Sequence, residues 1–456
     1  MRRGCPPRTR RLRETTTLTF KALRKCGRVV LLLTTGVAVQ SIGFSNLPVS
    51  QPGQSVVAST STLKTVKRSR PARSQVSPAP EPTPLAMAWV APARVATPAA
   101  VPARVPSRGV TAPTSGGLRI GLSFGDTLPG LSPTALAQTL DDAVALGTGW
   151  IRVDLAWSDV QYQSAGSYDW AGFDRVVHAA RARDLRVLPI LAYTPVWARP
   201  AGCDSDKCAP ADANAFASFA AAATHRYAPQ GVHAWEIWNE PNIHGFWKPA
   251  PNITQYVDLL RVAVPAIKGA DPAATVVSGG LAPAPSSGGD ISQIDYLTGF
   301  SKLGGPKLVD AIGYHPYSFP VPPAYKANWN AWAQIAATPI SFQSVLAAYG
   351  SADKKIWITE YGAPTNGPRL GATTSDYKVT ATPGPDHVDE ALQAQMATES
   401  VGLAKHSSMI VALFWYSYRD LGTSTSNVEN FFGLRRHDGS PKPAYAALKQ
   451  AIATKP

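Results

Sequence analysis

The stretch Ala234-Trp-Glu-Ile-Trp-Asn-Glu-Pro-Asn242 begins as a β-strand and ends at a proline. Side chains along a strand alternate between two faces, so we expect one face to carry Trp235, Ile237 and Asn239 and the other to carry Glu236, Trp238 and Glu240. Because Pro241 cannot donate a hydrogen bond to a neighbouring strand, Glu240 lies where the strand leaves the sheet. The sequence therefore predicts an accessible carboxylate at this strand end.

A second strand ends in the same way. The segment Lys355-Ile-Trp-Ile-Thr-Glu-Tyr-Gly362 is a β-branched run that closes on Glu360. In a barrel of alternating strands and helices, catalytic side chains collect at the carboxyl ends of the strands. We therefore take Glu240 and Glu360 as the candidate catalytic pair.

From Gly116 onward, strand-like and helix-like segments alternate along the chain. The strand-like segments are 118–124, 150–155, 186–193, 234–240, 275–281, 308–317, 355–362 and 410–416. The helical patterns cover 132–146, 170–183, 213–226, 253–269, 291–301, 342–349, 388–405 and 443–453. This alternation predicts an α/β fold in which residues 116–456 form a single (β/α)8 TIM barrel preceded by a disordered N-terminal segment.

The two glutamate motifs resemble those of a known group of enzymes. Asn239-Glu-Pro241 and Thr359-Glu-Tyr-Gly362 look like the motifs on the fourth and seventh strands of the retaining glycoside hydrolases of clan A. The ending of that clan is also matched, by Phe432-Gly-Leu434 and by Asp438-Gly-Ser-Pro-Lys-Pro-Ala-Tyr445. The resemblance covers Gly116 to Pro456.

The resemblance implies a role for each of several residues. Glu240 would be the general acid/base and Glu360 the nucleophile of a double displacement. The supporting residues would be Arg152 and Tyr317 beside the nucleophile, Asn239 on the sugar 2-hydroxyl, His315 lining the sugar site and Trp415 as a platform under the reacting ring. We expect Glu236 to be a buried structural carboxylate paired with an arginine, in a network that Asp154 joins.

Two further segments are most similar to family 39 of the clan, which includes hydrolases of bacterial exopolysaccharides, with family 5 cellulases next. These segments are Tyr193-Thr-Pro-Val-Trp-Ala198 and Asn239-Glu-Pro-Asn-Ile-His-Gly-Phe-Trp247. Within that pattern, Trp197, His244 and Trp247 would line flanking sugar subsites.

The front of the chain differs in composition. Residues 1–115 hold 18 Lys and Arg against two acidic residues, whereas Gly116 to Pro456 holds 26 basic and 28 acidic residues, so the basic charge does not indicate nucleic-acid binding by the barrel. In residues 1–45 a basic lead precedes the apolar run Val29 to Phe44, which predicts an export signal, either cleaved or retained as a membrane anchor. Residues 46–115 are rich in Pro, Ala, Ser and Thr, which predicts a disordered linker.

The cysteines divide between the two parts. Cys5 and Cys26 fall in the expected export segment, and Cys203 and Cys208 flank one short loop. In an exported protein this spacing favours a local disulfide. No second Cys or His pair lies close in sequence, and the chain has no phosphate-binding glycine motif, so we expect no metal and no cofactor.

Together these features predict an exported, monomeric retaining β-glycosidase that hydrolyses an extracellular or cell-envelope polysaccharide, with membrane or envelope association through the N-terminal segment. Two alternatives use the same residues. One is a barrel that binds glycan through its tryptophans without cleaving it, and the other is a transglycosylase that passes the glycosyl group to a sugar instead of water.

Overall fold

A computed structural model describes residues 117–377 and 384–455. The expected export segment, linker and cysteines of residues 1–115 lie outside the described residues. In the part that is described, no helix combines the length and the apolar character needed to cross a membrane.

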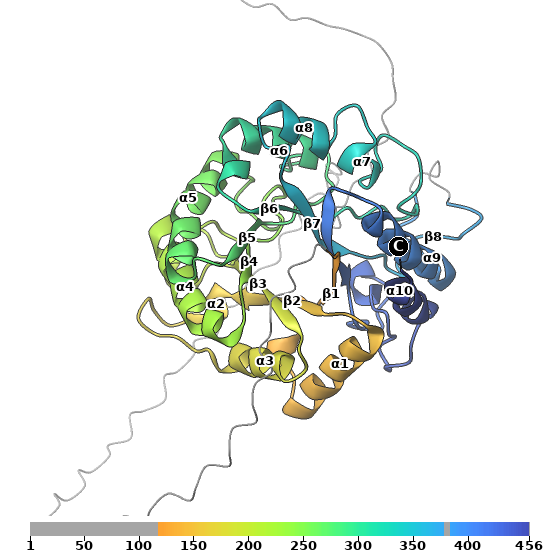
Figure 1. The fold of residues 1–456 in the computed structure, drawn as a ribbon, viewed down its shortest axis with the longest axis horizontal. Helices are drawn as coiled ribbons and strands as arrows, with labels where there is room; N and C mark the ends of the chain where they lie inside the picture. Colours follow the sequence, from red (N-terminus) through yellow and green to blue (C-terminus); the bar gives the residue numbers. More distant parts are fainter. Residues whose placement is uncertain (1–116, 378–383, 456) are drawn as a thin grey trace, which may run out of the picture. The chain divides into compact units, whose positions relative to one another are not determined.

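Within the described residues, parallel strands close into a barrel in the order β1-β10-β7-β6-β5-β4-β3-β2 (Figure 1). The barrel strands are β1 Arg119–Ser123, β2 Trp150–Ala156, β3 Arg186–Ala192, β4 Ala234–Ile237, β5 Thr275–Ser278, β6 Ala311–Tyr314, β7 Lys355–Tyr361 and β10 Ile410–Tyr416. The short strands β8 Gly371–Ala372 and β9 His387–Val388 pair separately. The predicted (β/α)8 barrel is confirmed.

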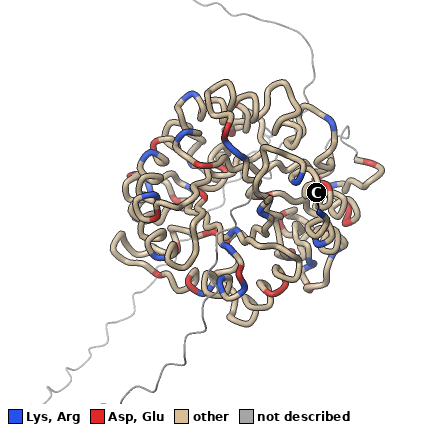
Figure 2. The backbone as a smooth tube through the Cα atoms, viewed as in Figure 1, with Lys and Arg blue, Asp and Glu red and all other residues tan. Residues whose placement is uncertain are grey.

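The helices form a ring around the barrel (Figure 1). The longer ones are α1 Pro133–Leu146, α3 Ala171–Arg181, α4 Ala213–Tyr227, α5 Ile253–Ala270, α6 Gln293–Lys302, α8 Phe342–Ala348, α9 Glu390–Lys405 and α10 Pro443–Ala453. Short turns of helix are α2 Trp157–Val160, α7 Ala333–Ala336, η1 Leu128–Gly130, η2 Val196–Ala198, η3 Ala228–Gln230, η4 Gly305–Lys307 and η5 Val428–Phe431. Figure 2 shows cationic and anionic residues interspersed around this ring.

Local sequence explains where helices begin. The side chain of Ser132 accepts a hydrogen bond from the backbone N–H of Ala135, and Pro133 occupies the first turn of α1, where its missing N–H costs nothing. In α4, α5 and α9 the residues Asp212, Asn252 and Asp389 cap in the same way. Capping fixes these helix starts, and apolar packing against the strands holds the helices in place.

Two layers of side chains fill the barrel interior. The deeper layer is apolar and combines residues from several strands: Leu188, Ala234, Val277, Ala311, Trp357, Ala412 and Phe414. Arg152 and Glu236 are also fully buried, and they belong to a polar layer nearer the carboxyl ends of the strands. The barrel is thus closed below by apolar packing and carries its charges toward the mouth.

Replacing a glycine by alanine should change the stability in opposite directions at a tightly packed strand position and at an open helix position. A Cβ at Gly313 in β6 would overlap the carbonyl oxygen of Ser278 and the backbone of Gly280, whereas a Cβ at Gly402 in α9 would meet nothing within 4 Å. We expect Gly313→Ala to lower the free energy of unfolding by about 1–3 kcal/mol or more, because backbone must move. Gly402→Ala should raise it by about 0.5–1 kcal/mol through helix propensity.

Urea unfolding of both variants beside the unchanged protein measures these differences. The close strand packing at β6 would be contradicted if Gly313→Ala were as stable as Gly402→Ala, or more stable.

Candidate active site

A buried arginine organises the carboxyl end of the barrel. Nε of Arg152 donates to Oε2 of Glu236 at 2.6 Å, and one Nη donates to Oδ1 of Asn239 at 2.9 Å. The other Nη donates to Oγ of Ser123 at 3.1 Å and to Glu360. Arg152 is the third residue of β2, and its long side chain reaches the mouth from there.

Glu236 is the buried carboxylate paired with an arginine that we expected. Besides Arg152, it accepts hydrogen bonds from Oγ1 of Thr359 at 2.9 Å and from the backbone N–H of Gly280 at 3.0 Å. All of its neighbours are protein groups, and its side chain is sealed from solvent. Glu236 therefore supports the site and is not placed to meet a substrate.

The end of β4 departs from the simple alternation that the sequence predicts. The strand stops at Ile237, and Trp238 and Glu240 take left-handed φ angles of 71° and 44°. These left-handed residues break the period of two, so Asn239 faces Arg152 on the same side as Glu236 and Glu240. Trp238 instead packs outward against Trp247 of the loop between β4 and α5, with ring centroids 5.1 Å apart.

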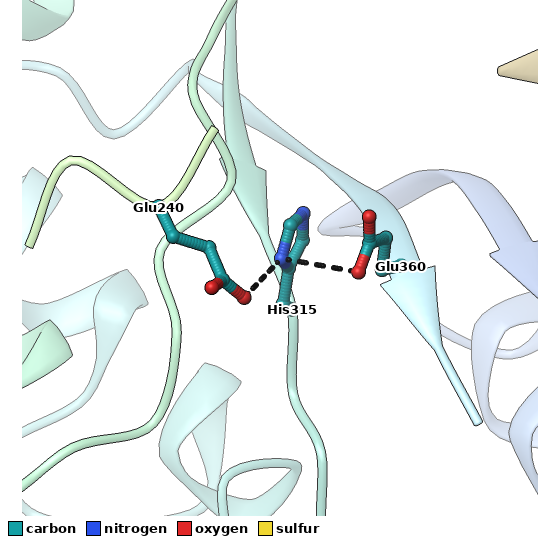
Figure 3. Close-up of side chains that lie close together, drawn as sticks. All are labelled: Glu240, His315 and Glu360. Atoms are coloured by element: carbon teal, nitrogen blue, oxygen red, sulfur yellow. Dashed lines mark hydrogen bonds and ion pairs between the residues drawn. The ribbon is translucent and has the colours of Figure 1, made fainter. Parts of the chain in front are cut away.

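His315 lies between the two candidate catalytic carboxylates (Figure 3). Its Nδ1 is 2.9 Å from Oε1 of Glu240 and 3.7 Å from Oε2 of Glu360, and its Nε2 is 3.0 Å from Oγ1 of Thr359. One carboxylate oxygen of each glutamate and a ring nitrogen of His315 lie within 4.8 Å of one another. The fold thus brings together two strand ends that are far apart in sequence.

The surroundings push the pKa values of the two glutamates apart. Burial raises the pKa of Glu240, and His315 offsets only part of that rise. Burial acts on Glu360 in the same direction, but the charges of His315 and Arg152 and the hydroxyl of Tyr317 outweigh it and lower its pKa. Tyr317 donates to Oε2 of Glu360 at 2.8 Å. Glu240 is thus favoured as the proton carrier and Glu360 as the anion.

Glu240, His315 and Glu360 are also the kinds of side chain that hold a divalent cation, and their donor atoms are close enough to do so. Arg152 opposes such a use, because its fixed positive charge already contacts Glu360. The arrangement suits an anion and a neutral acid better than a metal.

Trp415 does not form the platform that the sequence suggested. It is 1% exposed and packs in the outer core, edge-on to Tyr361 with centroids 5.8 Å apart. Ala412 and Phe414 point into the barrel interior, so the alternation along β10 directs Tyr416 to the mouth. Burial raises the pKa of Tyr416, and the charges of Glu429 and Glu360 raise it further. The Tyr416 ring packs against Phe432, with centroids 5.3 Å apart, and Phe432 in turn contacts Tyr317, which bonds Glu360.

Of the three residues expected to line flanking sugar subsites, the structure contradicts Trp247, and the roles of Trp197 and His244 stay predictions because both side chains reach the surface. Trp247 is fully buried, edge-on to Tyr256, and belongs to the core. Trp197 donates its indole N–H to the carbonyl of Gln161 at 2.6 Å, and Nδ1 of His244 is 2.7 Å from Oδ1 of Asp290. Among residues 117–377 and 384–455, no hydrogen bond, ion pair or ring contact joins any of these three to Glu240, His315 or Glu360.

A disulfide joins Cys203 and Cys208 in the loop after β3. The loop packs beside the site, because the backbone N–H of Thr194 donates to the carbonyl of Asp206 at 2.7 Å and Nζ of Lys207 lies 3.3 Å from the ring centroid of Tyr193. The disulfide therefore closes the loop that carries Lys207.

Comparison with known proteins supports this arrangement. The model of the cellulase family, glycosyl hydrolase family 5, matches residues 124–392, which include both glutamates. A β-xylosidase of Geobacillus stearothermophilus is 37% identical over 99 residues, which are 21% of this chain and 18% of that protein. The chain thus spans less than a fifth of that relative.

Two solved structures share the fold. One is a family 39 glycoside hydrolase from the gut symbiont Bacteroides cellulosilyticus, with a TM-score of 0.56 and 22% identity over 74% of this chain and 64% of that one. The other is GH5_18 from Streptomyces cattleya in complex with GlcNAc, with a TM-score of 0.55 and 18% identity over 75% and 82%. At these identities the likeness shows the fold alone.

The expected resemblance to clan A is confirmed. The matching family model is that of family 5, which the motifs ranked after family 39. It spans well over half of the chain and both strand-end glutamates. The chain belongs to glycosyl hydrolase family 5, the cellulase family of clan A.

Proposed function

We propose that this protein is a retaining β-glycosidase that hydrolyses O-glycosidic bonds by double displacement. The observation that carries the proposal is the pair Glu240 and Glu360, whose closest oxygens lie within 4.8 Å and whose pKa values shift in opposite directions. Carboxyl groups about 5 to 5.5 Å apart suit retention, whereas inversion needs about 6.5 to 9.5 Å to admit a water molecule.

In the first step the ionised carboxylate of Glu360 attacks the anomeric carbon, and Glu240 donates its proton to the leaving oxygen. In the second step Glu240, now a carboxylate, takes a proton from water, and that water displaces Glu360 from the glycosyl-enzyme. Both steps need the two carboxyl groups close together, one on each side of the glycosidic bond.

The neighbours suit these roles. Arg152 and Tyr317 stabilise the negative charge that Glu360 needs before attack. His315 bonds Glu240 and Thr359 at once, which fixes the direction of the acid. Asn239 uses its carbonyl oxygen for Arg152, so its amide nitrogen is left to meet a sugar hydroxyl.

We further propose a polysaccharide outside the cytoplasm as the substrate. The disulfide between Cys203 and Cys208 supports an oxidising compartment. Tyr317 bonds Glu360, and Tyr416 packs on the same Phe432 ring as Tyr317, so two aromatic rings lie at the mouth, and sugar faces stack on such rings. Cleavage of small aryl glycosides without release from any polysaccharide would contradict this part of the proposal.

The direct test is product release from a panel of β-glucans, xylans, mannans, galactans, arabinans and envelope polysaccharides. We expect the unchanged protein to release sugar and Glu360→Gln to lose at least about 10⁴-fold in turnover, because the amide cannot act as the anionic nucleophile. Glu240→Gln should lose about 10²- to 10⁴-fold, the usual contribution of a general acid.

Glu390→Gln is the matched control, since it makes the same change in a surface ion pair with Arg436 and should leave turnover unchanged. Binding without release by the unchanged protein would favour the glycan-binding barrel. Longer products than the starting chains would favour the transglycosylase.

Stereochemistry tests retention independently. Proton NMR of the first product formed from a β-linked substrate should show the β-anomer, because two inversions at one carbon restore the starting configuration. If the α-anomer forms first, Glu360 cannot be the nucleophile.

The pH dependence of kcat/KM follows from the two shifts. Activity should fall as pH drops through the lowered pKa of Glu360 and as pH rises through the raised pKa of Glu240. Tyr317→Phe removes a donor that lowers the pKa of Glu360, so the acid limb should move to higher pH while the alkaline limb stays. Movement of the alkaline limb alone would reverse the assignment of the two glutamates.

A further inference from the structure

Asp154 is a buried carboxyl group at the barrel mouth that the proposed reaction does not use. It lies two residues after Arg152 on β2 and shares its inward face, since Val153 and Leu155 pack in the outer core. It is 9% exposed, and within the described chain no side-chain or backbone group donates a hydrogen bond to its carboxylate.

Arg152 does not supply the missing partner. Its five N–H groups go to Glu236, Asn239, Ser123 and Glu360, which leaves none for Asp154. Burial raises the pKa of Asp154 to about 7, as expected for a carboxyl group that lacks donors. Its oxygens are not among the buried polar atoms sealed without a partner, so they are open to the mouth.

Tyr193 likewise has a largely buried hydroxyl group without a hydrogen-bond partner in the described part of the chain. The residue follows β3 with a left-handed φ of 70° and is 7% exposed. No residue of the described part bonds its hydroxyl, and that oxygen is not sealed either. Burial raises the pKa of Tyr193, and the charge of Asp154 raises it further, whereas that of Arg152 lowers it. Tyr193 directly follows β3, which pairs with β2 in parallel as far as Ala156, so Tyr193 and Asp154 lie at the same edge of the barrel mouth.

The charges around Asp154 and Tyr193 limit the kind of sugar that can bind there. The charges that shift the pKa of Asp154 most are those of Arg152, Glu360, Asp126 and Lys207. Both cations already have acidic partners, since Arg152 contacts Glu236 and Glu360, and Nζ of Lys207 lies 3.1 Å from Asp206. A carboxylate on the sugar would meet three acidic side chains, Asp154, Glu360 and Asp126, while both cations among these neighbours already contact acids, which disfavours a uronic acid.

We propose that Asp154 and Tyr193 are substrate-binding residues of the sugar subsite beside Glu360, and that they bind hydrogen-bond donor groups of a neutral or amino sugar. The donor is a hydroxyl or an ammonium group of the sugar, since both donate hydrogen bonds that a carboxylate can accept. The inference rests on the proposed glycosidase function and adds its substrate class.

The test measures binding in the Glu360→Gln protein, where cleavage does not interfere. Calorimetric titrations use cello-, xylo-, manno- and galacto-oligosaccharides, glucosamine oligomers and oligogalacturonate. We expect a neutral or amino oligosaccharide to bind best, and Asp154→Asn to weaken that binding by roughly 10- to 100-fold, as for a hydrogen bond to a charged group. Tyr193→Phe should weaken it by roughly 2- to 10-fold.

Two controls keep the result specific. Asp258→Asn makes the same change in an exposed ion pair with Arg261 and should leave binding unchanged. Tyr193→Phe removes one oxygen only, so it tests the site even if Asp154→Asn does not fold. A larger loss on glucosamine oligomers than on neutral ones identifies an ammonium donor, and equal losses identify a hydroxyl.

The inference is overturned if oligogalacturonate binds best, if no neutral or amino oligosaccharide binds, or if both substitutions leave affinity unchanged. Failure of the glycosidase proposal looks different, because the unchanged protein, with Glu360 in place, would then bind a sugar without releasing product.

Discussion

The buried guanidinium of Arg152 is the interaction on which the site depends. A charge taken out of water is costly unless acceptors surround it, and here they come from β1, from β4 and the residues after it, and from β7. The same contacts that neutralise Arg152 therefore hold the strand ends in one geometry. Removing any of the acceptors would leave a buried donor unpaired, so structure and chemistry are linked through one side chain.

The contrast between Glu240 and Glu360 arises from their partners. Burial acts on both carboxyl groups and favours their neutral forms. Glu360 accepts hydrogen bonds from the guanidinium of Arg152 and the phenol of Tyr317, whereas Glu240 shares one hydrogen bond with the imidazole of His315. Two side chains of the same type, both glutamates, thus differ in the direction of their pKa shifts only because their neighbours differ.

Residues with strained backbone angles lie at two strand ends of the candidate site. Trp238, Glu240 and Tyr193 are non-glycine residues with left-handed φ angles, a conformation that costs free energy. At β4 this geometry turns Asn239 and Glu240 to the same side, which regular alternation does not allow. The buried contacts of Trp238 with Phe216 and Trp247 compensate by holding the turn in place.

The sequence by itself determined the barrel, because the periods of strands and helices and the capping residues are local properties. It also singled out Glu240 and Glu360 as the candidate pair, since one follows β4 and the other lies near the end of β7, and the carboxyl ends of all barrel strands meet at one edge. Only the tertiary structure decided which aromatic rings reach that edge: Trp415 and Trp247 are core residues, and Tyr416 faces the mouth. Burial depends on neighbours from distant segments, and a single left-handed residue reverses the face of those after it, so neither can be read from local spacing.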